Sequence, residues 1–253
     1  METLFIGQQR FDAATSASTN SWALEALRDG KVQEGALFTT KDQTSGRGQR
    51  GNSWESSPGK NLTMSLVLYP SWLKPGEQFC LSQVISLAVA GTLEELLPKT
   101  FSGAIRIKWP NDIFVGEKKV GGILIENSIR EGLITASVAG IGLNLNQPEF
   151  ATAPQAASLL QIAGKEADLE DCISRLCKQI EWRYLKLKAG KKAELKSEYL
   201  EKLFGLDEMR SFQIKEEIVY GSLRGVTEAG LLVLEFADGG QRTFDIKELK
   251  FIF

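Results

Sequence analysis

Apolar residues recur along this chain with two different periods, which separates expected helices from expected strands. In residues 62–68 every second residue is apolar, which predicts a strand with one buried face. Apolar residues recur at helical spacing over 76–97, 168–189 and 191–204, so a helix is expected in each segment. Another helix is predicted to begin after the polar run at Ser18 and to end at Gly30.

Short strands account for most of the remaining chain. They are expected at 3–6, 35–43, 104–109, 112–115, 120–127 and 133–146. The last three are separated by GEKK and REG, which are tight-turn sequences, so they should pair as antiparallel hairpins. From about Leu206 short strands broken by EAG and DGG indicate a small barrel. The expected fold is α+β, with a mixed and mostly antiparallel sheet in a domain over 1–205 and a β-barrel over 206–253.

The charge balance narrows the expected partners. The 253 residues include 30 lysines and arginines and 32 aspartates and glutamates, so no overall basic field attracts a nucleic acid or an anionic membrane. No apolar run is expected to reach the roughly 18 residues of a membrane span, and the first residues lack the features of a signal peptide. A cytoplasmic protein without nucleic-acid or membrane partners is expected.

Two residue types limit the possible chemistry. The chain contains no histidine, which excludes Ser-His-Asp and Cys-His nucleophiles and histidine-ligated zinc. Cys80, Cys172 and Cys177 lack the spacing of a zinc site or a disulfide framework, and they are expected to be reduced core thiols. The remaining functional groups are suited to anionic substrates.

The segment SGRGQRGNSW at 45–54 matches the dinucleotide-binding pattern G-x-G-x-x-G. No helix is expected after it, however, and residues 56–76 contain no acidic residue that could bind a ribose. A dehydrogenase is therefore disfavoured. The glycines and arginines instead indicate close approach of the backbone to an anion.

Two further segments contain more polar residues and glycines than strands require. In KWPNDIFVGEKKVGGILIE the pair after Pro110 is expected at a strand end, and a hairpin returns Lys119 to it. In AGIGLNLN, Gly140 and Gly142 lie within a predicted strand, where they indicate that another group approaches closely.

Together these segments resemble the biotin protein ligases. GRGQRGNSW is similar to the family's glycine and arginine loop, KWPND with KKVGGILIE to its central motif, ASTN to its substrate-binding serine and threonine, and GLNLN to its nucleotide-side strand. The resemblance covers about 17–146, and more weakly the final β segment. It implies a catalytic domain of the class II synthetase type followed by an SH3-like barrel.

The resemblance implies a two-step ligation with biotin, ATP and Mg²⁺. Biotin is activated as biotinyl-5′-AMP and then transferred to a lysine of a biotin carboxyl carrier protein domain. The family's optional N-terminal DNA-binding domain is expected to be absent, and a repressor function with it. Monomer and homodimer both remain open, and the barrel is either a stabilising cap or a surface that contacts the carrier domain or closes over ATP.

The resemblance also assigns residues. It implies catalytic roles for Arg47, Asp112 and Lys119. It implies biotin contacts from Ser18, Thr19, Asn20, Gln43, Gly46, Arg47, Gly48, Lys119 and Gly122. It implies nucleotide contacts from Gln49, Arg50, Trp54, Asn111, Lys119, Gly142 and Asn144. No metal ligand is certain, because Mg²⁺ would be held mainly by the ATP phosphates, and Asp112 could position either the metal or the incoming lysine.

The loop departs from the family's usual pattern at two positions. Gln49 and Asn52 stand where arginines are frequent, so we expect the adenylate to be held less tightly, unless Arg50 compensates. A lipoate or octanoate ligase is the nearest alternative, but its substrate has no urea for a polar pocket to bind. A binding protein on a degenerate ligase scaffold is a second alternative, which the presence of Arg47 and Lys119 disfavours.

Overall fold

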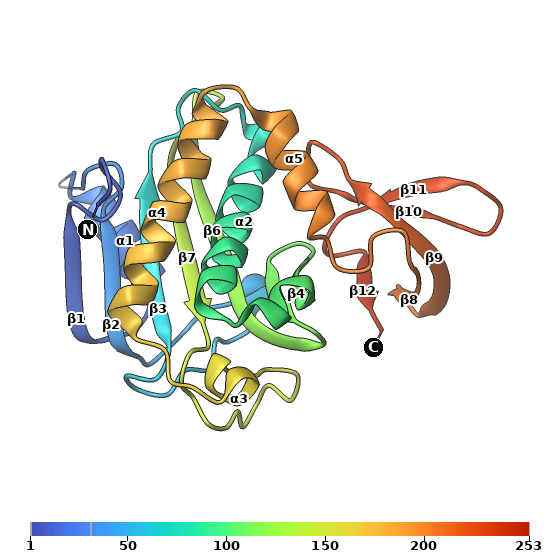
Figure 1. The fold of residues 1–253 in the computed structure, drawn as a ribbon. Coiled ribbons are helices and arrows are strands. Elements are labelled where there is room, and N and C mark those ends of the chain that lie inside the picture. The colour runs from blue at the N-terminus through green and yellow to red at the C-terminus, as the bar shows by residue number, and fades with distance from the viewer. Residues whose placement is uncertain (1, 31, 253) are drawn as a thin grey trace.

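A seven-stranded mixed sheet forms the centre of the molecule. The computed structural model describes residues 2–30 and 32–252, with only the backbone described at residue 50. The strand order is β1-β2-β3-β7-β6-β5-β4 (Figure 1). The strands are β1 (Arg10–Ser16), β2 (Leu37–Gln43), β3 (Leu62–Leu68), β4 (Ile105–Lys108), β5 (Asp112–Val115), β6 (Lys118–Arg130) and β7 (Leu133–Leu143). The pair β1 and β2 is parallel and the other pairs are antiparallel, which confirms the predicted mixed sheet.

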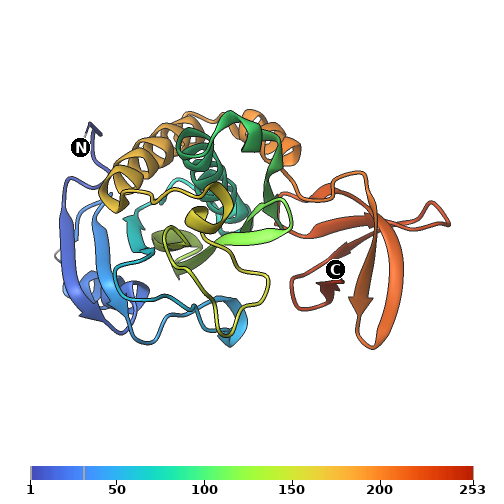
Figure 2. The ribbon, with the colours of Figure 1, turned by 60° about the horizontal axis from the view of Figure 1, so that its bottom comes forward.

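Helices cover both faces of this sheet (Figure 2). The helices α2 (Phe79–Leu96) and α4 (Leu169–Lys188) pack on one face and α1 (Thr19–Arg28) on the other. The prediction that 62–68 is buried on one face only was wrong, because all seven residues of β3 are buried. Leu66 packs in the cluster under α2, whereas its neighbour Val67 packs in the cluster under α1.

Two tight turns build the predicted hairpins. Gly116 and Glu117 connect β5 to β6, and Glu131 and Gly132 connect β6 to β7. Glu131 and Gly132 have φ values of 50° and 74°, as a two-residue turn between twisted antiparallel strands requires. The hairpins place β5, β6 and β7 side by side, with the polar segments of the sequence at adjacent strand ends.

The first strand lies further along the chain than predicted. Residues 3–6 form no strand, because the backbone N–H groups of Leu4, Phe5 and Ile6 donate to the carboxylate of Glu181 on α4, at 2.8–3.1 Å. Strand β1 begins at Arg10 instead. Most of its residues are half-buried or exposed at the sheet edge, so its sequence has no clear apolar alternation.

The predicted helices are confirmed with shorter bounds. A 3-10 turn at Pro75–Glu77 precedes α2, and α5 (Lys192–Glu201) ends before the predicted residue 204. The short helix α3 (Leu159–Ala163) was not predicted. The stretch Pro75–Leu96 has the length and composition of a membrane-spanning helix, contrary to our expectation, but 72% of its most apolar window is buried inside the fold.

The cysteines are free thiols, as predicted. Cys172 and Cys177 are buried on α4, and burial raises the pKa of each thiol to about 12. Cys80 is half-buried on α2, and burial raises its pKa as well. A high pKa leaves little thiolate at neutral pH, so these side chains act as apolar groups.

A five-stranded antiparallel sheet follows α5 and lies beside the larger sheet (Figure 1). Its strands are β8 (Met209–Ile214), β9 (Glu217–Val226), β10 (Leu232–Glu235), β11 (Gln241–Phe244) and β12 (Leu249–Phe251), in the order β11-β10-β9-β8-β12. Its buried side chains join the core that lies under α2, and Trp109 Nε1 donates to Gly230 O at 2.8 Å. This sheet fits the expected small C-terminal β domain, whereas the boundary at 205 and 206 remains a prediction.

Candidate active site

The glycine-rich segment at 46–54, here called the glycine loop, folds as a small hairpin. Trp54 N donates to Gly46 O at 2.9 Å and Gly48 N donates to Asn52 O at 2.6 Å, around a 3-10 turn at Gln49–Gly51. An irregular segment leads from the loop into β3, so no helix N-terminus faces a phosphate here. The inference that the dinucleotide pattern is accidental is confirmed.

The glycine loop borders a cavity of about 340 Å³, here called the first cavity. The other walls come from the start of α1, the connection between β4 and β5, strands β6 and β7, and residues 246–251 of the smaller sheet. The structure brings these predicted site residues together around it: Ser18, Thr19, Asn20, Gln43, Arg47, Gly48, Gln49, Trp54, Asn111, Asp112, Lys119, Gly122 and Gly142.

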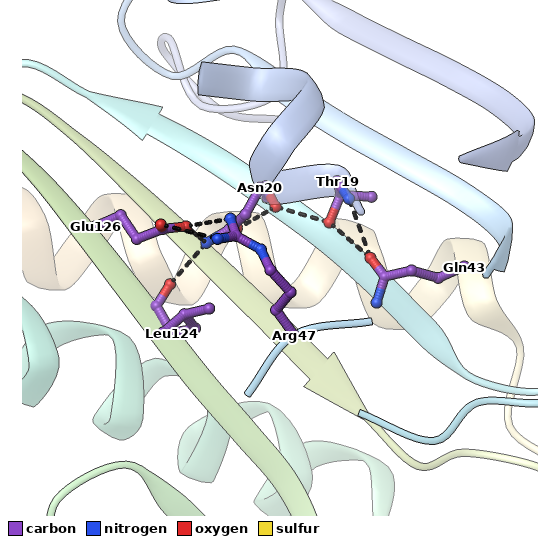
Figure 3. Close-up of polar contacts among 7 residues, drawn as sticks. Thr19, Asn20, Gln43, Arg47, Leu124 and Glu126 are labelled. Atoms are coloured by element: carbon purple, nitrogen blue, oxygen red, sulfur yellow. Dashed lines mark hydrogen bonds and ion pairs between the residues drawn. The ribbon is translucent and has the colours of Figure 1, made fainter. Parts of the chain in front are cut away.

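Polar side chains at the start of α1 form a buried network (Figure 3). The backbone N–H of Thr19 donates to Gln43 Oε1 at 3.0 Å. The Ser65 hydroxyl on β3 lies 2.7 Å from the Thr19 hydroxyl and 2.6 Å from Asn20 Oδ1. Thr19 and Asn20 are only 4% and 3% exposed. The cavity is therefore lined by hydrogen-bonding groups whose orientations are already fixed by their neighbours.

Glu126 connects this network to the glycine loop. Its carboxylate accepts a hydrogen bond from Asn20 Nδ2 at 2.8 Å and forms an ion pair with Arg47 at 2.7 Å (Figure 3). Asn20 Nδ2 also donates to Leu124 O at 3.2 Å. The amide of Asn20 is thus fully engaged by the protein, so Asn20 supports the wall of the cavity rather than presenting a free donor.

Two glycines of β7 provide space for other side chains, as the sequence indicated. A Cβ atom at Gly140 would lie 2.3 Å from Asn20 Oδ1, and one at Gly142 would lie 2.4 Å from the indole of Trp54. A Cβ at Gly122 on β6 would also meet this indole, at 3.1 Å. The indole of Trp54 therefore lies over β6 and β7 at a point where neither strand has a side chain.

The hairpin of β5 and β6 brings Lys119 to Asp112. Their side chains form an ion pair at 2.6 Å, and the register between β5 and β6 shifts between Ile113 and Phe114. Asn111 is used differently: its Nδ2 donates to Ile123 O at 2.7 Å. That bond commits the Asn111 amide to the backbone of β6, although the residue lines the cavity.

Lys108 adds a third cation to this wall. Its Nζ lies 5.1 Å from the ring centre of Phe251 on β12 and 5.6 Å from that of Phe114 on β5. Burial lowers the pKa of Lys108, and the neighbouring carboxylate of Asp112 opposes the decrease. The smaller sheet therefore contributes directly to the cavity, with Lys250 also in its lining.

A second cavity of about 300 Å³ adjoins the first. Both are lined by Asn52, Ser53, Trp54 and Lys119. The second cavity is further lined by Asn144 at the end of β7 and by Phe150, Thr152, Ala153 and Ala156 of the segment that follows. Lys119 thus lies where the two cavities meet.

Unpaired buried polar atoms mark both cavities. Within the described residues, Gln49 Oε1 in the first cavity, Asn144 Oδ1 in the second and Trp54 Nε1 between them have no hydrogen-bond partner. A buried polar atom without a hydrogen-bond partner lowers the stability of the fold, so such atoms are commonly hydrogen-bonded by a ligand or by water. Their places fit a bound polar ligand that extends through both cavities.

Two predicted residues lie apart from the cavities or cannot be placed. Gly46 lies behind the wall, where a Cβ would meet Trp54 O at 2.5 Å and Gln43 Nε2 at 2.8 Å. The side chain of Arg50 lies outside the described part of the chain. Sequence analysis missed Ser65 and Glu126, although an acidic residue inside the apolar run GGILIE was a signal for the latter.

The donor groups around the cavities do not resemble a protein-held metal centre. In residues 2–30 and 32–252, side chains of histidine, cysteine, aspartate and glutamate form no cluster of three or more. The carboxylate of Asp112 lines the first cavity, and it is paired with Lys119. This donor set suits a hard cation that brings most of its oxygen ligands with it.

Comparisons with known proteins agree with this geometry. Residues 13–144 match the Biotin/lipoate A/B protein ligase family. The chain is 30% identical to the bifunctional ligase/repressor BirA of Bacillus subtilis, over 96% of this chain and 74% of the relative. It is 29% identical to the biotin--[acetyl-CoA-carboxylase] ligase of Paracoccus denitrificans, over 89% of this chain and 95% of the relative.

A solved structure supports the same assignment. The biotin protein ligase of Aquifex aeolicus in complex with biotin and ATP superposes with a TM-score of 0.79 at 27% identity, covering 97% of this chain and 100% of the other. The agreement extends over both sheets, since nearly the whole chain is covered. The chain belongs to the Biotin/lipoate A/B protein ligase family and, within it, to the biotin protein ligases.

Proposed function

We propose that the protein joins biotin to a lysine of a biotin carboxyl carrier protein domain in two steps that consume ATP. The observation that carries this proposal is the position of Lys119, which lines both cavities at their junction. A reaction between a carboxylate and a triphosphate requires fixed positive charge where the two anions meet. Relatives named as biotin ligases, and a related structure with biotin and ATP bound, support the same pair of substrates.

In the first step, an oxygen of the biotin carboxylate forms a bond to the α-phosphorus of ATP, and pyrophosphate leaves. Lys119 and Arg47 would stabilise the negative charge that develops on the phosphate, Arg47 after leaving its ion pair with Glu126. Asp112 holds the Lys119 ammonium in place at 2.6 Å. Mg²⁺, carried mainly by the ATP phosphates, would share the neutralisation of charge.

In the second step, the neutral amine of the carrier lysine attacks the acyl carbon of biotinyl-5′-AMP. An amide bond forms, the bond from the acyl carbon to the phosphate oxygen breaks, AMP leaves and the nitrogen gives up a proton to solvent. Asp112 is half-buried at the wall of the first cavity, where its carboxylate can accept a hydrogen bond from the incoming amine and orient it. We propose this role for Asp112 in addition to its pairing with Lys119.

The buried polar network favours biotin over lipoate. Ser18, Thr19 and Gln43 line the first cavity with donors and acceptors that a urea can match and an alkyl chain cannot. Thermal unfolding with biotin or lipoate tests this choice, because a ligand that binds the folded protein raises the transition temperature, and a tighter ligand raises it more at the same concentration. Stabilisation by biotin alone is expected, and stabilisation by lipoate alone would reverse the choice.

We further propose a ligase without a repressor role. The formal net charge is −2, which provides no basic field for DNA. The relative from Bacillus subtilis is named a bifunctional ligase/repressor, so this point needs its own measurement. Fluorescence anisotropy with duplex DNA, in the presence of biotin and ATP, should show no binding at physiological salt.

The decisive experiment is intact-mass measurement of a carrier domain after incubation with the protein, biotin and MgATP. The carrier should gain the mass of one biotinyl group, and the gain should require ATP. Lys119→Ala should abolish it, whereas Lys118→Ala, at the exposed neighbouring position, should not. No gain with biotin, together with no gain with lipoate on its own carrier, would leave only a binding role.

A further inference from the structure

The segment from Asn144 to Ser158, between β7 and α3, forms one wall of the second cavity. Its ends are fixed by backbone hydrogen bonds: Leu159 N donates to Asn144 O at 3.0 Å, and Lys119 N donates to Gln155 O at 2.9 Å. Between these ends the segment has no helix or strand. Its centre therefore depends on contacts made by side chains.

The side-chain amides of Gln147 and Gln161 donate to Glu149 O and Pro148 O, each at 2.7 Å. At 151–152 the contacts come from one carboxylate, that of Glu55. Its Oε1 accepts hydrogen bonds from Ala151 N at 2.7 Å and Gln147 Nε2 at 3.4 Å. Its Oε2 accepts from Thr152 N at 2.8 Å and from the Thr152 hydroxyl. In the described part of the chain, the hydrogen bonds found for Ala151 and Thr152 all end on Glu55.

Glu55 is adjacent in sequence to Trp54, whose indole separates the two cavities. The carboxylate thus ties the end of the glycine loop to the opposite wall, which carries Phe150 and Thr152. Glu55 lines the second cavity but not the first. The Thr152 hydroxyl holds the pKa of Glu55 below its usual range, so the group is ionised at neutral pH.

We propose that Glu55 is a positioning residue for the nucleotide: it holds the wall at 150–152 against the glycine loop and so sets the affinity for ATP without setting that for biotin. The inference rests on the proposed function, in which the second cavity receives the nucleotide. A wall that is already ordered loses little conformational entropy when the ligand binds. A released wall must be ordered by ATP itself, and the apparent affinity then falls with the population of the ordered state.

Glutamine is a strict probe at this position. Each carboxylate oxygen of Glu55 accepts hydrogen bonds from donors of the wall. In glutamine an NH₂ group replaces one of these oxygens, and an NH₂ group cannot accept from those donors. Size and shape are otherwise retained. Glu149→Gln is the matched control, because it makes the same charge change at an exposed position of the same segment.

The test compares Michaelis constants for the two substrates, measured by carrier biotinylation. Glu55→Gln should raise the KM for ATP about tenfold, as expected for lost hydrogen bonds to a charged group. The KM for biotin and kcat at saturating ATP should change by less than about twofold, the usual range for a change without a local role. Glu55→Asp, which retains both acceptors, should recover part of the ATP affinity, and Glu149→Gln should resemble wild type.

A binding measurement separates this inference from the proposed function. Titration with a non-hydrolysable ATP analogue should show the same loss of affinity in Glu55→Gln without any turnover. Equal KM values for ATP in the variant and wild type, or equal increases for ATP and biotin, would overturn the role of Glu55 alone. A wild-type protein that biotinylates no carrier would overturn the proposed function instead. If Glu55→Gln fails to fold, Thr152→Val removes the hydroxyl donor at an exposed position and should still weaken ATP binding.

Discussion

A Cβ atom on Gly142 would lie 2.4 Å from Cε2 of Trp54, so the indole occupies the space that any other residue at position 142 would need. Trp54 ends the glycine loop and lines both cavities. Gly142 lies in β7, in the middle of the large sheet. The backbone of a rigid central strand therefore determines where the wall between the two cavities stands.

Alanine at position 142 should displace the indole of Trp54. The contact is too short for small adjustments, so we expect a loss of stability of about 1–3 kcal/mol, typical of overpacking, together with weaker binding of both substrates. Thermal unfolding and tryptophan fluorescence measure the two effects. Gly103→Ala is the control, since no atom lies within 4 Å of a Cβ there. Unchanged stability and activity in Gly142→Ala would show that the indole has another comparable position.

Gln49→Arg should slow the release of the adenylate intermediate. Gln49 lines the first cavity, and its Oε1 has no partner among the described residues. A longer cationic side chain would therefore extend from the wall of the cavity in which we propose that the adenylate binds. One added partly exposed charge contact of about 1 kcal/mol corresponds to about fivefold slower release. The release is timed after the intermediate forms in the absence of the carrier. Gln33→Arg makes the same charge change at an exposed distant site, and equal release rates in both variants would contradict the idea.

The sequence allowed the hairpins and the residues around KWPND to be predicted because both depend on local signals. Turn residues between apolar segments determine that β5, β6 and β7 are neighbours, and this adjacency together with the register shift brings Lys119 to Asp112. Gly140 and Gly142 were anomalous within a strand, and close approach of another group was the correct reading. What approached them could not be predicted, since Asn20 and Trp54 are distant in sequence.

Features that depend on the meeting of distant segments were missed. Strand β3 was predicted with one exposed face, because its polar residues gave no sign that α1 would cover them. Residues 3–6 have the sequence of a strand, but the backbone N–H groups of Leu4, Phe5 and Ile6 donate to Glu181, which is distant in sequence. Glu55 has no distinctive local sequence, and Glu126 is marked only as an acidic residue in an apolar run. Their contacts lie 97 and 79 residues away, at Thr152 and Arg47.

Glu126→Gln should release Arg47 and tighten binding of the adenylate. Arg47 is 42% exposed and pairs with Glu126, so an incoming phosphate must compete with that carboxylate. Exposed ion pairs contribute about 0.2–1 kcal/mol, so we expect up to about fivefold tighter binding, and less at high salt. Glutamine can still accept from Asn20. Calorimetric titration with biotinyl-5′-AMP measures the effect, with Glu131→Gln in the exposed turn between β6 and β7 as the control. Weaker binding would mean that the charge of Glu126 is needed to orient Asn20.

Lys108→Met should change how stability depends on pH. Burial lowers the pKa of Lys108 from its ordinary value of 10.5, so between the folded and unfolded pKa values the unfolded chain binds more protons. The contribution of Lys108 to stability is therefore least favourable at low pH and improves as the pH rises towards 10.5. Urea unfolding of both proteins from pH 7 upwards, with Lys118→Met as an exposed control, should show wild type gaining stability relative to Lys108→Met. A stability difference between the two proteins that does not change with pH would mean that Lys108 has the same pKa in the folded and unfolded states. Its contacts with Phe114, Phe251 and Asp112 would then offset the effect of burial on the charged form.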